Sequence, residues 1–261
     1  DKKIAVVGDV MLDEFTWGEV KRISPEAPVP VVEVIRQTQQ LGGSANVVSN
    51  IKALGGNPIT IAVTGRDAAG ERLRVLYRNL DIDSSYLTDD DRQTTIKTRI
   101  IANNQQVVRT DHEDRTPLPS AVTKALGKHF LEVIPECEAV IVSDYDKGVV
   151  NPELLGTILP EASRAGVPVF LDPKVHHANY YKPTTLITPN QREAELLSGK
   201  RIMDTASLEE AGRQLLGRFE CPYVLITRGR EGMSLFESKT IHHLSGTARE
   251  VYDVSGAGDT V

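Results

Sequence analysis

The chain has 261 residues, a formal net charge of −6, and two cysteines, Cys137 and Cys221, far apart in the sequence. This length suits one large α/β domain, and mixed charges with a small net excess argue against a general nucleic-acid surface. No run approaches the ~20 apolar residues of a membrane span, and we expect no signal peptide before the first apolar run. We therefore expect a cytoplasmic protein with reduced thiols and no membrane partner.

Short, continuously apolar runs recur along the chain and predict buried strands at residues 4–7, 140–142, 167–171, 186–187 and 224–226. Continuous hydrophobicity implies burial on both faces, as in a parallel sheet covered by helices. Helical stripes lie between these runs: Val47, Val48, Ile51 and Leu54; Val122, Leu126 and Phe130; Leu208, Ala211, Leu215 and Phe219. This alternation predicts a doubly wound α/β fold with a mostly parallel sheet and helices on both faces.

Two segments interrupt the alternation. Residues 28–35 are typical of an extended piece, and residues 94–111 of a hairpin around a turn at residues 103–106. We expect them to form a small antiparallel β flap, a lid made of roughly residues 10–36 and 94–111 and inserted in one domain of residues 1–261. Because the flap has exposed edges and apolar positions, we expect a second subunit to cover it in a homodimer.

Polar residues follow each predicted strand at its carboxyl end. They are, in chain order, Asp9 and Asp13, Asp144 and Lys147, Lys174, Asn190, and Thr227, Arg228 and Gly229. Open α/β sheets bind ligands in the crevice outside these ends. An aspartate cap or an ordinary turn explains the polar residues after any one strand. Their presence after all five strands predicts a ligand site.

Three further patterns have both a functional and a plain structural interpretation. Gly42 and Gly43 open the first long helix and allow a substrate close to the backbone, while Asn46 suits sugar hydroxyls or is simply a surface polar residue. Asn190 and Glu193 share a helix face, where Glu193 suits the helix dipole or holds waters around Mg²⁺. Residues 227–232 are typical of a turn between strands, and their small residues would also allow a triphosphate to lie alongside them.

The histidines at 176–177 and 242–243 have no partners at metal-ligand spacing, so we do not expect them to bind a metal.

The last motif is Gly256, Ala257, Gly258 and Asp259. The small residues let an anion approach the backbone, and a helix beginning there would direct its N–H groups and positive end at a phosphate. Asp259 adds a carboxylate able to take a proton from an attacking hydroxyl. Alone, the motif is better explained as a tight turn capped by aspartate. Together with the polar strand ends it predicts phosphoryl transfer.

These motifs, in this order, resemble those of the ribokinase-type (PfkB) carbohydrate kinases over essentially the whole chain. The family usually has Asp-Thr-x before its Gly-Ala-Gly-Asp motif, where this chain has Asp253, Val254 and Ser255. Residues 22–32, 143–148, 172–174 and 250–254 further resemble D-glycero-β-D-manno-heptose-7-phosphate kinases. Those enzymes make the 1,7-bisphosphate for ADP-heptose and the lipopolysaccharide core, and some carry a nucleotidyltransferase domain after the kinase.

The resemblance implies ATP, Mg²⁺ and a sugar phosphate as ligands. Asp259 would be the base, and Gly256, Ala257 and Gly258 the anion hole. Asn190 and Glu193, the latter through water, would serve ATP–Mg²⁺, with Thr227, Arg228, Gly229 and Gly232 beside the nucleotide. The sugar would contact Asp9, Asp13, Gly42, Gly43, Asn46 and Asp144. Its distal phosphate needs cations, for which Lys97, Arg99, Arg109, Lys147 and Lys174 are candidates, although each is equally explained as a solvated charge.

Family members continue well past the Gly-Ala-Gly-Asp helix, so we expect the domain to be C-terminally incomplete in this sequence. Two other interpretations stay open: another PfkB sugar or sugar-phosphate kinase, and a non-catalytic sugar-phosphate-binding module of the same fold. The presence of Asp259 speaks against the second, because a module without activity has no need of a base.

Overall fold

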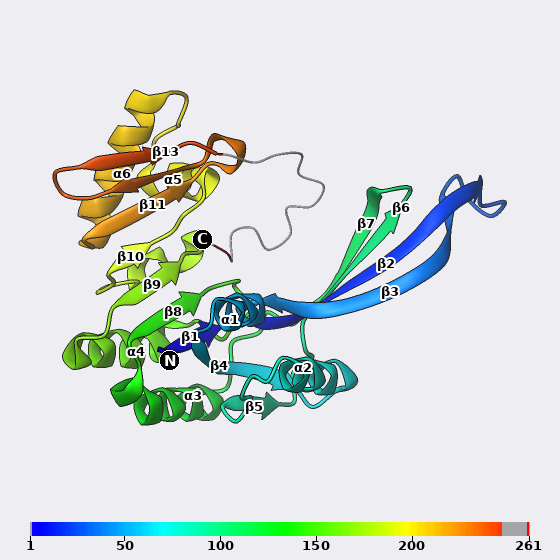
Figure 1. Ribbon diagram of the computed structural model, residues 1–261, viewed down its shortest axis with the longest axis horizontal. Helices are drawn as coiled ribbons and strands as arrows, with labels where there is room; N and C mark the ends of the chain where they lie inside the picture. Colours follow the sequence, from blue (N-terminus) through cyan, green and yellow to red (C-terminus); the bar gives the residue numbers. More distant parts are fainter. Residues whose placement is uncertain (1, 247–259, 261) are drawn as a thin grey trace.

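The computed structural model describes residues 2–246 and 260, and its largest element is a nine-stranded sheet (Figure 1). The order across the sheet is β13 (Ile241–Leu244), β12 (Met233–Phe236), β11 (Tyr223–Thr227), β10 (Leu186–Ile187), β9 (Val169–Asp172), β8 (Ala139–Ser143), β1 (Lys3–Gly8), β4 (Asn57–Gly65) and β5 (Leu87–Asp90). Strands β11 to β5 run parallel, whereas β12 pairs antiparallel with β11 and β13 pairs antiparallel with β12. The carboxyl ends of the five predicted strands therefore meet at one edge.

Helices cover both faces of this sheet. On one face, α1 (Ser44–Ala53) and α2 (Ala68–Asn79) pack against β1 and β4. On the other lie α3 (Ser120–Val133), α4 (Pro152–Ala165), α5 (Gln191–Ser198) and α6 (Thr205–Phe219). Alternate residues of β1 belong to opposite clusters, Val7 to the α4 side and Val6 to the α1 side. This confirms the predicted α/β fold with helices on both faces.

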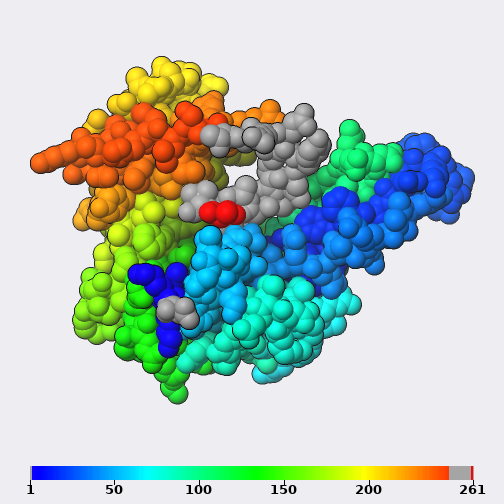
Figure 2. All heavy atoms as spheres, viewed as in Figure 1, coloured from blue at the N-terminus to red at the C-terminus, as the bar shows by residue number. Residues whose placement is uncertain are grey.

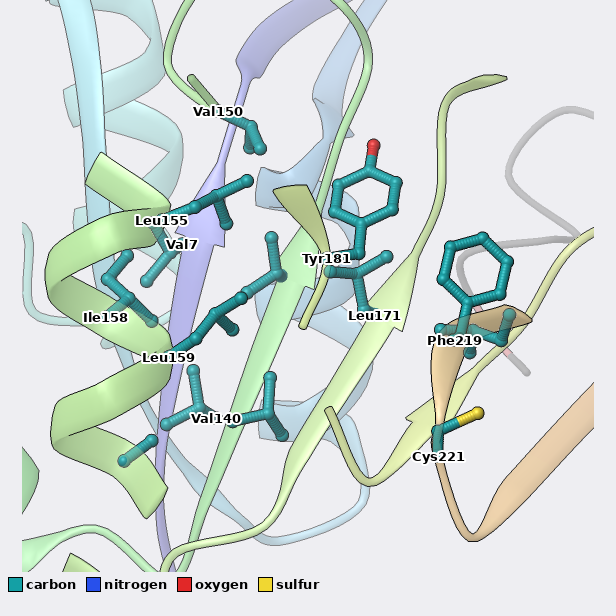
Figure 3. Close-up of a cluster of buried hydrophobic side chains, with 14 of the residues drawn as sticks. Val7, Val140, Val150, Leu155, Ile158, Leu159, Leu171, Tyr181, Phe219 and Cys221 are labelled. Atoms are coloured by element: carbon teal, nitrogen blue, oxygen red, sulfur yellow. The ribbon is translucent and has the colours of Figure 1, made fainter. Parts of the chain in front are cut away.

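The larger core cluster shows how the apolar stripes are buried (Figure 3). Ile158 and Leu159 of α4 pack over Val7 and Val140, and the side chains are almost completely inaccessible to solvent. The predicted stripe of α6 is likewise buried along its length. The prediction was wrong for one residue of the α1 stripe. Leu54 is 87% exposed, because α1 ends at Ala53 and Leu54 is its C-terminal cap.

Four strands form a second sheet, here called the flap. They are β3 (Pro30–Gly43), β2 (Val10–Ile23), β6 (Ile96–Ala102) and β7 (Gln105–His112), in that order. The flap consists of two antiparallel hairpins whose inner strands, β2 and β6, run parallel. The turn of the second hairpin contains Asn103 and Asn104 with φ of 50° and 61°, the left-handed backbone that tight two-residue hairpins require.

The flap projects from the carboxyl edge of the main sheet (Figures 1 and 2). β1 continues into β2 through Asp9, and β3 leads directly into α1 through Gly43. Short 3₁₀ turns at Ile134–Glu136, Val175–Tyr180 and Gly229–Glu231 complete the connections. Within residues 2–246, no helix is long and apolar enough to cross a membrane.

Candidate functional site

Asp9, at the junction of β1 and the flap, holds the loop that follows β8. Its side chain is 2% exposed, and its carboxylate accepts hydrogen bonds from the backbone N–H groups of Tyr145 (2.9 Å), Lys147 (3.2 Å) and Val149 (3.0 Å). Burial and the nearby charge of Asp144 raise the pKa of Asp9 to about 6, despite these three bonds. Asp9 therefore positions the β8 loop against the flap, and its contact with a sugar hydroxyl stays a prediction.

The two glycines at the end of β3 allow the backbone to pass close to two aspartates. A Cβ on Gly42 would lie 2.5 Å from Oδ2 of Asp13, and one on Gly43 would lie 2.4 Å from the carbonyl oxygen of Asp9. Gly43 also has a φ of 58°, which disfavours other residues. Asn46 follows in the first turn of α1 and is half-buried. The structure thus brings the predicted hydroxyl-binding residues together where the flap joins the main sheet.

The candidate cations on the flap all have carboxylate partners. Arg99 donates to Oδ1 of Asp13 at 2.7 Å, and its guanidinium lies over the Phe15 ring. Lys97 and Arg109 share Asp111, at 3.5 Å and 2.9 Å. Although burial acts to raise it, the pKa of Asp111 lies below its ordinary value because Arg109 and Lys97 donate to it.

Lys147 and Lys174, the candidates nearer the main sheet, are also paired. Lys147 lies 2.6 Å from Oε2 of Glu113, which follows β7 and also binds Arg115. Lys174 lies 2.8 Å from Oε1 of Glu193 on α5. Each of the five candidate cations therefore already has a carboxylate partner. A substrate phosphate must either replace that carboxylate or bind the cation beside it.

Asp144 is the centre of a buried polar cluster behind this edge. Its side chain is 0% exposed. Oδ2 accepts hydrogen bonds from the Tyr181 hydroxyl and from Nδ1 of His177, both at 2.6 Å, and Oδ1 accepts one from the backbone N–H of Asp146 at 2.8 Å. These bonds attach the Val175–Tyr180 turn to the end of β8. Sequence reasoning missed His177 because its partner lies 33 residues away.

This cluster predicts a dependence of stability on pH. The hydrogen bond to Asp144 raises the pKa of His177 above 6.5, and burial raises that of Asp9 to about 6, so the folded state binds both protons more tightly than the unfolded state. Their stabilisation is complete below the unfolded pKa values and is lost as the pH rises through the folded ones. In urea unfolding between pH 5 and 8, we expect His177→Gln to lose less stability with rising pH than the unchanged protein.

The matched control is His176→Gln, since His176 is exposed and adjacent in the chain. It should follow the unchanged protein across the pH range. Equal slopes for all three proteins would contradict the prediction.

Asn190 and Glu193 form a reciprocal capping box at the start of α5. The Asn190 side chain accepts from the Glu193 N–H at 3.0 Å, and Oε2 of Glu193 accepts from the Asn190 N–H at 3.1 Å. The plain structural role of both residues is therefore real. Asn190 also bridges to Thr227 at the end of β11, which places the two predicted nucleotide motifs side by side.

The segment after β11 is a tight turn into β12. Arg228 pairs with Glu231 at 2.8 Å, and Gly229 has a φ of 54° in open space. A Cβ on Gly232 would lie 2.0 Å from the carbonyl oxygen of Leu244, so packing against β13 requires this glycine. The nucleotide role of these residues stays a prediction.

Magnesium prefers oxygen ligands, and Glu193 is the carboxylate predicted to meet it on this side of the edge. In the described part of the chain, no group of three or more His, Cys, Asp or Glu side chains is placed to hold a metal. Both oxygens of Glu193 accept bonds, from Lys174 and from Asn190, and its contact with magnesium through water stays a prediction.

The predicted residues Gly256, Ala257, Gly258 and Asp259 lie outside the described residues. Thr260, which follows them, accepts a hydrogen bond from Asn50 on α1 at 3.3 Å.

A mostly parallel sheet with polar loops at its carboxyl edge and a flap beside them is a ribokinase-like fold. The model of the pfkB family carbohydrate kinases matches residues 1–261, and the chain belongs to this family.

Curated relatives and solved structures agree with this assignment. The chain is 44% identical to "Bifunctional protein HldE" of Trichlorobacter lovleyi and 43% identical to that of Helicobacter hepaticus, covering 99% of this chain in each case. These matches cover 53% and 54% of the relatives, so the chain spans about half their length. Phosphofructokinase-2 from Escherichia coli, 19% identical, superposes with a TM-score of 0.83 over 100% of this chain and 83% of that one. Arabidopsis thaliana ribokinase with ribose and ATP, 16% identical, gives 0.74 over 99% and 82%.

Proposed function

We propose that the chain is a kinase domain that uses ATP and Mg²⁺ to phosphorylate D-glycero-β-D-manno-heptose 7-phosphate at its anomeric oxygen. The observation that carries the proposal is the order of groups along one sheet edge. Acceptor-binding candidates lie where the flap joins β1, and nucleotide-binding candidates lie at β10 and β11. The heptose-kinase-like stretches at residues 22–32 and 172–174, and the similarity to the HldE proteins, support this substrate.

The roles follow from this order. Asp13, Gly42, Gly43 and Asn46 hold the sugar near β1, and the flap cations Lys97, Arg99 and Arg109 hold its distal phosphate. Asn190, Glu193 and Thr227 lie on the nucleotide side. Asp259 takes the proton from the anomeric hydroxyl, and the N–H groups of residues 256–258 bind the transferring phosphoryl group, whose source is ATP.

The test is ADP release by the full-length protein with ATP, Mg²⁺ and heptose 7-phosphate, beside fructose 6-phosphate and ribose. We expect turnover with the heptose phosphate to exceed that with the other two. Preferential turnover of another sugar would retain the kinase and reject the substrate. Heptose phosphate binding without any ADP release would favour the non-catalytic module.

The product belongs to the route to ADP-heptose and lipopolysaccharide core, and the site of action is the cytoplasm. Both statements rest on the proposed substrate. We also propose that residues 1–261 belong to one kinase domain with the flap inserted in it as a lid.

We further propose a homodimer through the flap. Ile23, Val34, Ile35, Val107 and Val108 of the flap are exposed apolar side chains, and Ile35 is 69% exposed. We expect a dimer in sedimentation at micromolar concentration and a monomer after Ile35→Asp, because a carboxylate is costly to bury in an apolar contact.

The control is Leu54→Asp, at the exposed end of α1. It should remain dimeric. A monomer for the unchanged protein would reject this interface.

A further inference from the structure

Lys174 lies in the middle of the carboxyl edge of the main sheet, and hydrogen bonds to the buried Asp144 cluster fix the position of its backbone. It follows β9, between the ends of β8 and β10. Its N–H donates to the Tyr181 hydroxyl at 2.8 Å, which in turn donates to the buried Asp144 at 2.6 Å. The base of the side chain is therefore fixed by the Asp144 cluster.

The ammonium group of Lys174 lies between the loop after β8 and the start of α5, which follows β10. Its ion-pair partner is on the β10 side, Oε1 of Glu193 at 2.8 Å, while the centre of the Tyr145 ring of the β8 loop is 5.7 Å away. Glu193 belongs to the first turn of α5, directly after β10. Lys174 is thus in contact with the capping box of Asn190 and Glu193, which adjoins Thr227 of β11.

The shape of the proposed acceptor decides which phosphate this ammonium can reach. In a heptose 7-phosphate the reacting oxygen is on C1 and the existing phosphate is on C7, the two ends of the carbon chain, and the C6–C7 arm separates that phosphate from the ring. The reacting oxygen must meet the donor near β10, so the distal phosphate lies away from it. Lys97, Arg99 and Arg109 are on the flap, whereas Lys174 contacts a residue of the nucleotide side.

We propose that Lys174 binds the phosphate groups of the nucleotide, on the donor side of the transfer, and does not bind the distal phosphate of the sugar. This inference deepens the proposed kinase function and rests on it. Within the five candidate cations, it separates Lys174 from the three on the flap.

The charge of this side chain suits the role. Burial alone lowers the pKa of Lys174, but the ion pair with Glu193, with Asp172 and Asp144 beyond it, holds the pKa above its ordinary value. The group therefore stays an ammonium ion at neutral pH. A lysine acts on phosphates as a compact point charge with three donors, so it can bind a phosphate oxygen and keep Glu193 as a neighbour.

The experiment compares two affinities in the full-length protein by calorimetry. One ligand is adenylyl imidodiphosphate with Mg²⁺, and the other is heptose 7-phosphate alone. We expect Lys174→Met to weaken nucleotide binding by about tenfold or more, the usual loss for a charge-assisted bond, and to leave sugar-phosphate binding within about twofold. Lys174→Arg should retain much of the nucleotide affinity, because it keeps the charge.

Two further lysine variants serve as comparisons for Lys174→Met. Lys97→Met removes a flap cation. It should weaken binding of the sugar phosphate and leave nucleotide binding unchanged. Lys200→Met removes a lysine whose partner is Glu210 on α6, away from the edge, and should change neither affinity. If Lys174→Met does not fold, Lys174→Gln, whose amide can still donate to Glu193, replaces it.

Weaker sugar-phosphate binding with unchanged nucleotide binding, the pattern expected of Lys97→Met, would overturn the inference. Unchanged values for both ligands would also overturn it, leaving only a structural ion pair. Turnover of the unchanged protein is measured in parallel. Its absence with heptose 7-phosphate would reject the proposed function, while the nucleotide affinities would still decide the role of Lys174.

Discussion

Replacement of Asp259 by asparagine should lower kcat by about 10²- to 10⁴-fold, the range that a positioned general base contributes. The amide is similar in size to the carboxylate but cannot accept the proton of the attacking hydroxyl. Binding of nucleotide and sugar phosphate should change little, because the proton moves only in the reaction. Steady-state ADP release and calorimetric affinities of the full-length protein separate the two effects.

Asp81→Asn is the control for this change. Asp81 is fully exposed, pairs with Lys52, and has a φ of 51°, a conformation that asparagine also adopts readily. Its kcat should equal that of the unchanged protein. A kcat for Asp259→Asn within a few-fold of normal would require another base.

Asp144→Ala should reduce the free energy of unfolding by about 3 kcal/mol or more, as expected when a buried, hydrogen-bonded charge is removed and its partners are left behind. The Tyr181 hydroxyl, Nδ1 of His177 and the Asp146 N–H all lose their acceptor. Urea unfolding is the measurement, at neutral pH and in the absence of ligands.

Tyr181→Phe provides the scale for this prediction. It removes the hydroxyl's bonds to Asp144 and to the Lys174 backbone but leaves the Asp144 carboxylate with two donors and buries no unpaired charge, so its loss of stability should be smaller than that of Asp144→Ala. Equal losses for the two variants would mean that the hydroxyl, and not the carboxylate, holds the cluster together.

The main sheet was predictable because its strands are buried on both faces. Such strands are continuously apolar, as at residues 4–7 and 140–142, and this signal does not depend on distant partners. The length of β2 was harder to predict from the sequence. Beyond Phe15 this strand extends into the flap, where Glu19, Lys21 and Arg22 are largely exposed, so no hydrophobic pattern marks it.

The positions of candidate site residues were predictable from strand ends, but their partners were not. Asp13 meets Arg99 across 86 residues, and Lys174 meets Glu193 across 19. These contacts depend on strand order, which the sequence does not state. The same holds for His177, whose role as a partner of Asp144 has no local signal.

The parallel contact between β2 and β6 also bears on how the molecule folds. Its register joins Leu12 to Ile96 and Gly18 to Ala102, so the paired residues are 84 apart in the sequence, while each outer hairpin of the flap is local. Closing so long a loop is slow unless the intervening chain is already compact. We therefore expect the hairpins to form early and to join each other after β1, β4 and β5 have assembled, so that the sugar side of the site is completed among the last steps of folding.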